Sequence, residues 1–167
     1  MAEWLTHVLL AYATFRILSW YVEWLDSQWI SVGMVGAILP DLSRLNLVIS
    51  SDIISYFIGS EFDWFGIHTA GGIILLSGIG ALLFRDALEQ QKAFIMLLSG
   101  SISHILVDLP QRYADGKMIL DMYAFPLPLP RPVTPGWYVT PDRWVVLVAF
   151  VTAIVVFFAD QHRKSVK

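Results

Sequence analysis

Cysteine is absent from this chain of 167 residues. The absence excludes a disulfide framework, a thiolate nucleophile and a metal site with cysteine ligands. Charged residues are also scarce, at 15% of the chain, against about 25% in an ordinary soluble domain. The formal net charge is −3, so the chain lacks the basic surplus of a nucleic-acid-binding protein, and we expect no nucleic-acid partner.

Hydrophobic residues, in contrast, make up 56% of the chain. A disordered chain has low hydrophobicity, and a soluble domain of this size and composition would leave much apolar surface in water. The composition therefore predicts an all-α integral protein of the cell (inner, cytoplasmic) membrane, in contact with membrane lipid. We expect a single membrane domain over residues 1–167, with room for no more than five or six spans of about 20 residues.

Five apolar stretches predict a bundle of about five transmembrane helices. They cover about 4–22, 28–39, 66–84, 93–109 and 144–159. The second is short, since twelve helical residues rise only about 18 Å against a hydrocarbon core of about 30 Å. Residues 46–59 are apolar but interrupted by serines and an aspartate, which predicts a helix lying at the membrane interface, with a short span as the alternative.

The segment 110–143 differs from the rest because it holds most of the prolines. It predicts a stiff, extended loop that is either a linker or a lid over a site. After the last apolar stretch, the tail carries Arg163, Lys164 and Lys167. Positive charge favours the cytoplasmic side, so we expect a cytoplasmic C-terminus and, with five spans, an external N-terminus.

A few ionisable residues stand at the ends of the apolar stretches, where placing such groups costs free energy and calls for a reason. With five spans, the ends that carry them all face one side of the membrane, whichever side is external. Two of them, His104 and Asp108, lie four residues apart and project from one helix face. The complete set is His7, Asp41, His68, His104 and Asp108.

Three imidazoles and two carboxylates at one depth are suitable ligands for a divalent metal. This donor set predicts Zn²⁺ first, with Mn²⁺ or Fe²⁺ as alternatives. A structural hydrogen-bonded network that holds the helices together is the competing interpretation. The fourth histidine, His162, lies in the basic tail and is expected to be a surface residue.

The order of these motifs resembles the YdjM-like family of membrane-bound, metal-dependent hydrolases. The resemblance rests on Thr6–His7, on G-x-x-x-P-D at residues 36–41, on His68–Thr69 and on S-H-x-x-x-D at residues 103–108. Phe125–Pro126 is similar to a further family segment. Two positions depart from the family pattern: Ser43 stands where a second aspartate is common, and no second histidine closely follows His68.

The resemblance implies metal-assisted hydrolysis, and a more distant similarity to zinc-dependent phospholipase C implies a phosphoester as the substrate. In that interpretation Asp41 or Asp108 acts as a general base, alone or while also binding the metal. Arg44 and Arg112 are then candidates for holding a substrate phosphate. In the alternative, both side chains extend to the lipid headgroups and have no role in substrate binding. The depth of the site favours an amphiphilic or lipid-type substrate at the membrane surface.

A second interpretation is a non-enzymatic membrane protein, acting in transport or assembly, with a structural His/Asp network. Other catalytic classes lack their sequence signatures. The chain has no G-x-S-x-G, no H-E-x-x-H and no G-x-x-x-x-G-K-[ST], which argues against a serine lipase, a zincin protease and an ATP-driven protein.

Overall fold

The computed structural model describes residues 3–139 and 142–165, and over these residues the fold is all-helical without strands. Five longer helices form the bundle: α1 (Trp4–Leu18), α2 (Ser27–Gly36), α4 (Ala70–Ala81), α5 (Ala87–Asp108) and α7 (Arg143–Ser165). Four short elements connect them: the 3₁₀ helices η1 (Leu39–Leu47) and η2 (Trp64–His68), and the α-helices α3 (Ser51–Ile58) and α6 (Leu120–Tyr123).

Side-chain caps determine where several of these helices begin. The carboxylates of Asp26 and Asp86 accept hydrogen bonds from backbone N–H groups in the first turns of α2 and α5. The hydroxyl groups of Ser50 and Thr69 do the same for α3 and α4. These bonds satisfy N–H groups that have no partner inside the helix, so short polar residues mark the starts of apolar helices.

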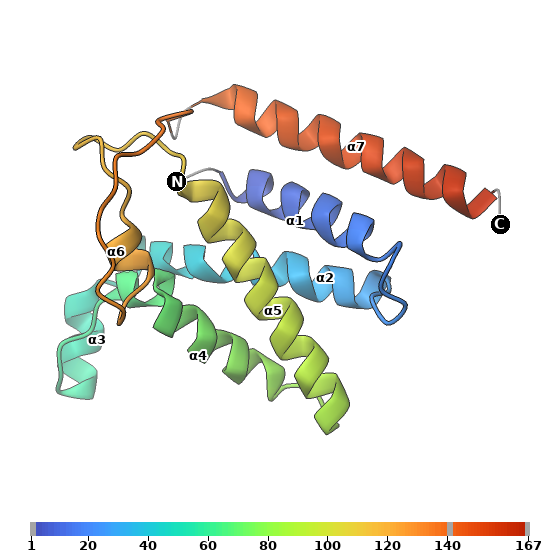
Figure 1. Ribbon diagram of the computed structural model, residues 1–167. Helices are drawn as coiled ribbons and strands as arrows, with labels where there is room; N and C mark the ends of the chain where they lie inside the picture. The colour runs from blue at the N-terminus through green and yellow to red at the C-terminus, as the bar shows by residue number, and fades with distance from the viewer. Residues whose placement is uncertain (1–2, 140–141, 166–167) are drawn as a thin grey trace.

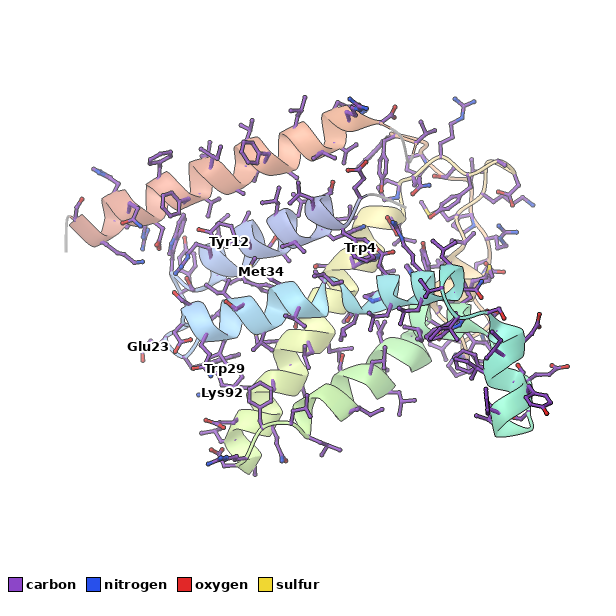
Figure 2. The ribbon with its side chains drawn as sticks, turned by 180° about the vertical axis from the view of Figure 1, so that it is seen from behind. Trp4, Tyr12, Glu23, Trp29, Met34 and Lys92 are labelled. Atoms are coloured by element: carbon purple, nitrogen blue, oxygen red, sulfur yellow. The ribbon has the colours of Figure 1, made fainter. Side chains whose placement is uncertain are left out.

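Helix α5 lies at the centre of the bundle, where it packs against α2 and α4, while α1 packs against both α2 and α7. Figure 1 shows α1 and α7 running side by side in the same direction. Both begin at the end of the molecule that carries α3, α6 and the loop around α6, and the C-terminus lies at the opposite end. In Figure 2, Trp29 and Lys92 lie together at this opposite end, with the Lys92 ammonium 5.7 Å from the Trp29 ring centroid.

The contact between α2 and α5 is unusually close because glycines line it. A Cβ atom on Gly100 would collide with the carbonyl oxygen of Gly33, and one on Gly36 would collide with the backbone of Leu97. The buried Ser101 hydroxyl donates to the carbonyl of Gly36 over 2.9 Å. Small residues that let helix backbones approach are typical of helix packing in membranes.

The prediction of about five transmembrane helices is wrong for the residues that the structure describes. Within residues 3–139 and 142–165, α7 alone is long and apolar enough to cross a membrane. Helices α1, α2 and α4 have 15, 10 and 12 residues, and at 1.5 Å per residue none reaches about 30 Å. Helix α5 has 22 residues, but its first turns are polar, from Glu89 to Lys92.

Several surfaces of the bundle are apolar and exposed. On α7, Leu147, Val151, Val155 and Phe158 are each more than half exposed and follow one face of the helix. Helix α3, inside the predicted interfacial segment 46–59, has no buried residue. Such contiguous apolar surface needs a cover other than water, which agrees with residence in a membrane.

The proline-rich loop is packed onto the bundle. The backbone N–H of Gly71, in the first turn of α4, donates to the carbonyl of Phe125 over 3.1 Å. Within the loop, Arg112 N–H donates to the Tyr138 carbonyl over 2.7 Å and Met118 N–H donates to the Pro132 carbonyl over 2.8 Å. The loop therefore covers one end of the bundle, which is the position that the lid interpretation requires.

The glycine contact predicts a difference between two glycine-to-alanine variants. Gly100→Ala places a methyl group against the Gly33 carbonyl, so we expect it to destabilise the protein by about 1–3 kcal/mol and to lower Tm by several degrees. Gly78→Ala is the matched control, because nothing lies within 4 Å of a Cβ atom there. Thermal unfolding in detergent measures both, and an equal Tm for the two variants would contradict the close α2–α5 contact.

Candidate metal centre

The structure brings all five predicted residues together at the end of the bundle that the loop covers. The Nε2 atoms of His7 and His104 lie 3.5 and 3.4 Å from carboxylate oxygens of Asp108, and that of His68 lies 3.8 Å away. Two sets have mutually close ligand atoms, within 4.8 Å of one another: His7, Asp41 and His104 form one, and His68, His104 and Asp108 form the other.

Each residue reaches the cluster from the end of its own element. His7 lies near the start of α1, and Asp41 follows Pro40 in η1. His68 ends η2 just before α4, while His104 and Asp108 occupy the last turns of α5. None of the five is more than 1% exposed. Burial of so many ionisable groups is costly unless each is paired or bound to a metal.

Two backbone carbonyls set the tautomers of two histidines. The Nδ1 atom of His68 lies 3.0 Å from the carbonyl oxygen of Pro40, and that of His104 lies 2.8 Å from the carbonyl oxygen of Ala37. Because a carbonyl only accepts, each Nδ1 must carry the proton, and in a neutral ring the lone pair is then on Nε2. Neither Nε2 forms a hydrogen bond among the described residues. This orientation is the one that metal-binding histidines commonly adopt.

Ring contacts also fix the imidazoles. The rings of His7 and His104 stack with centroids 3.6 Å apart, and the ring of His68 meets that of His104 edge-on at 5.0 Å. Neither His7 nitrogen forms a hydrogen bond among the residues that the structure describes. The third imidazole is thus positioned by stacking, whereas the other two are also held by carbonyl groups.

Asp41 links the cluster to a cavity. One of its carboxylate oxygens, Oδ1, accepts a hydrogen bond from Arg44 Nε over 3.1 Å. The other, Oδ2, is buried without a hydrogen bond among the described residues. Burial raises the pKa of the Asp41 carboxyl, although the charges of His104 and of the Arg44 guanidinium lower it. A cation beside Oδ2 would offset the cost of keeping this carboxylate charged.

The cavity beside Asp41 has a volume of about 340 Å³. Its lining is mostly apolar, with Leu42, Leu45 and Val48 among its residues. Arg44, half-buried, lines it too and places its guanidinium 5.7 Å from the centroid of the Trp4 ring. The cavity therefore combines a cation, an aromatic ring and aliphatic side chains next to a buried carboxylate.

Three tyrosines of the covering loop complete the surroundings, and the sequence analysis did not identify them. The Tyr123 ring stacks on His68 with centroids 5.3 Å apart. The Tyr113 hydroxyl donates to the backbone carbonyl of Asp108 over 3.1 Å, and the Tyr138 hydroxyl donates to that of Val107 over 2.6 Å. Burial raises the pKa of Tyr113 to about 12, so this hydroxyl stays protonated and remains a donor.

The second predicted phosphate-binding residue, Arg112, and the carboxylates of the loops lie elsewhere. The exposed side chain of Arg112 lies against Gly136 in the loop. Two carboxylates of the loop, Asp115 and Asp121, both form ion pairs with Arg131, at 2.8 and 3.3 Å. Asp63 caps η2 through the backbone N–H of Phe65. The structure therefore places Arg44, and none of these loop residues, directly beside the cluster.

Comparison with known proteins identifies a family for almost the whole chain. The family model described as YdjM inner membrane protein matches residues 1–166. No curated protein and no solved structure matches the chain significantly.

The position of the cluster predicts from which side of a membrane a cysteine introduced near it can be modified. Because the chain has no cysteine, Glu3→Cys, Ala114→Cys and Gln161→Cys each create a single thiol at an exposed position. Glu3 is the N-cap residue of α1, which carries His7, and Ala114 follows Tyr113, whose hydroxyl donates to the Asp108 carbonyl, so both lie near the His/Asp cluster. Gln161 lies near the C-terminal end of α7. We expect a membrane-impermeant maleimide to label the first two variants from one side and the third from the other.

Labelling of Glu3→Cys and Ala114→Cys from opposite sides would contradict the common location of the cluster. Total labelling after detergent solubilisation is the control, because it shows that all three thiols react equally once access is free.

Proposed function

The chain belongs to the YdjM inner membrane protein family, and from this premise we propose that it is a membrane-embedded, metal-dependent hydrolase. The observation that carries the proposal is the convergence of three buried imidazole Nε2 atoms on the Asp108 carboxylate at 3.4–3.8 Å. A tetrahedral metal site with bonds of about 2.1 Å separates its ligand atoms by about 3.4 Å. The Nε2 atoms of His68 and His104 therefore lie about as far from Asp108 Oδ2 as two ligands of one ion lie from each other, while His7 groups with Asp41 and His104.

The residues proposed to hold the metal are those of the cluster. The proton on Nδ1 of His68 and of His104 leaves each Nε2 lone pair for an ion, and Asp108 supplies carboxylate oxygens. His7 and Asp41 extend the donor set, with His104 common to both groups of ligand atoms. Imidazole with carboxylate suits Zn²⁺, with Mn²⁺ and Fe²⁺ as the alternatives.

A bound divalent ion lowers the pKa of a coordinated water to about 7 and polarises the bond to be cleaved. The protein groups proposed to act with it are carboxylates. Asp41 is the better placed base, because its Oδ2 is buried and makes no hydrogen bond among the described residues. Arg44 holds Oδ1 at 3.1 Å and so keeps the carboxylate in one orientation. Asp108, between three imidazoles, suits the role of ligand.

The substrate class that we propose is an amphiphilic phosphoester. The cavity beside Asp41 offers aliphatic side chains for an acyl or isoprenoid portion, and the Arg44 guanidinium for a phosphate. Arginine suits such a group because its planar donors pair with phosphate oxygens. The expected similarity to zinc-dependent phospholipase C points to the same reaction class, although fold-level analogy alone does not assign a reaction.

The proposed orientation places the cluster on the outer face of the inner membrane. Arg163 and Lys164 end α7, and basic residues beside a span favour the cytoplasmic side. Because α7 begins at the end that holds the His/Asp cluster, a cytoplasmic C-terminus puts the cluster outside.

A structural role for the cluster is the second candidate, and the degree of burial favours it. None of the five residues is more than 1% exposed, and such burial suits a network that holds helices together. In this alternative the network, with or without a metal, holds α1, α5 and the η1–η2 region together in a non-enzymatic membrane protein.

The metal content of the purified protein tests whether the His/Asp cluster is a metal centre. We expect purified wild-type protein to contain a divalent metal and His104→Ala to contain at least fivefold less, because both groups of ligand atoms share His104. His162→Ala is the control, since this residue is exposed in the tail. Inductively coupled plasma mass spectrometry measures the content, with His68→Ala as a second variant. Equal metal in wild type and both cluster variants, or none in any, would refute the metal centre.

Substitution of Arg44 tests the substrate cavity. An arginine bond to a charged group contributes about 1.5–3 kcal/mol, so Arg44→Gln should raise KM about tenfold or more toward a phospholipid or phosphodiester that the metal-loaded protein hydrolyses. Arg112→Gln, which removes the other predicted phosphate-binding residue, should have a smaller effect because its side chain lies against the loop. Metal content must stay unchanged in both variants.

The reverse order of the two KM values would show that the substrate does not enter beside Asp41. A metal-loaded protein that hydrolyses none of a panel of phospholipids and phosphodiesters would favour the structural role.

A further inference from the structure

Another cavity, with a polar lining, lies where α1 and α7 end, at the opposite end of the bundle from the His/Asp cluster. Its volume is about 210 Å³, and Arg16, Ser19, Trp20, Asp160, Arg163 and Lys164 are among its lining residues. Three of these side chains are cationic and one is anionic, which leaves an excess of two positive charges. An excess of this kind, partly shielded from water, attracts an anion.

Asp160 organises the cations around the cavity. Its carboxylate forms ion pairs with Lys164 Nζ at 2.7 Å and with Arg16 Nε at 3.8 Å. It also accepts a hydrogen bond from the Trp20 indole over 3.1 Å. One carboxylate therefore keeps two cations of different helices close together without neutralising both.

Arg163 provides the charge that Asp160 does not balance. Its guanidinium lies over the Trp20 ring, 4.8 Å from the ring centroid, in a cation–π contact that holds the group at the cavity. In the part of the chain that the structure describes, Arg163 forms no ion pair. A guanidinium has several N–H donors, so one in a cation–π contact can still donate to the oxygens of a phosphate.

The location of the cavity indicates where the anion comes from. Helix α7 is long and apolar enough to cross a membrane. Its exposed Val155 and Phe158 precede Asp160 and Arg163, respectively, by between one and two turns. The cations therefore lie where the hydrocarbon-facing surface ends, at the level of lipid headgroups. Basic pockets between membrane helices at that level are sites for anionic headgroups.

We propose that the cavity formed by Arg16, Trp20, Arg163 and Lys164 binds the phosphate of an anionic phospholipid headgroup. The acyl chains of this lipid would lie along the exposed apolar face of α7. The site is separate from the His/Asp cluster, so it does not depend on whether the protein is a hydrolase.

Native mass spectrometry of the full-length protein in an uncharged maltoside detergent tests the proposal. Dioleoylphosphatidylglycerol and dioleoylphosphatidylcholine, offered at equal concentration, serve as probes. We expect the wild type to retain the anionic lipid at least fivefold more strongly, and Arg163→Gln to reduce this preference to less than twofold. Arg163→Lys, which keeps the charge, should retain most of the preference.

Arg85→Gln is the matched control, because it removes an equally exposed cation from the connection between α4 and α5. It should bind like the wild type. Equal retention of the two lipids by the wild type, or equal loss of preference in Arg85→Gln and Arg163→Gln, would overturn the proposal. Lys164→Gln replaces Arg163→Gln if thermal unfolding shows that the latter is not folded.

Inorganic phosphate, titrated into the same protein, separates a lipid from a soluble ligand. Binding of phosphate that depends on Arg163, with no preference between the two lipids, would show that the ligand is a free phosphate and that the lipid assignment is wrong.

Discussion

Two backbone hydrogen bonds determine what the cluster can do. The carbonyls of Ala37 and Pro40, three residues apart at the end of α2 and the start of η1, accept from His104 and His68. Because a carbonyl has no proton to give, these bonds choose the tautomer of each ring and direct both Nε2 lone pairs toward the carboxylate of Asp108. The segment 37–40, where α2 ends and η1 begins, therefore positions the histidines of both η2 and α5.

The sequence identified the five cluster residues because the chain is so apolar. In a chain with 15% charged residues, a histidine or aspartate at the end of an apolar stretch stands out, and alternation of helix direction places such ends together. His7, His68 and Asp108 are found in this way although they are far apart in the chain. The convergence of these residues depends on the order and direction of the helices and not on their exact lengths, so it holds although the predicted number of spans is wrong.

What the sequence could not supply depends on tertiary contacts. Hydropathy indicates apolar character but not where a helix ends, so it predicts one span over 66–84, where the structure has η2 ending at His68 and α4 beginning at Ala70. The tyrosines of the loop gave no signal either, because an aromatic residue among prolines is ordinary and only the folded loop brings Tyr123 onto His68. Likewise, the sequence offers Arg44 and Arg112 as equal candidates for binding phosphate, and only the structure shows that Arg44 contacts the cluster while Arg112 lies against the loop.

The glycine contact between α2 and α5 has a consequence for how this protein can change. Gly36 and Ser101 meet one turn away from the pair formed by Ala37 and His104. A change in the separation of the two helix backbones would therefore also change the distance between the Ala37 carbonyl and the His104 ring. A larger residue at Gly36 or Gly100 would not simply loosen the bundle, since it would also withdraw the carbonyl from the imidazole. The packing of α2 against α5 and the position of the His104 ring are therefore coupled, and a substitution that alters one is expected to alter the other.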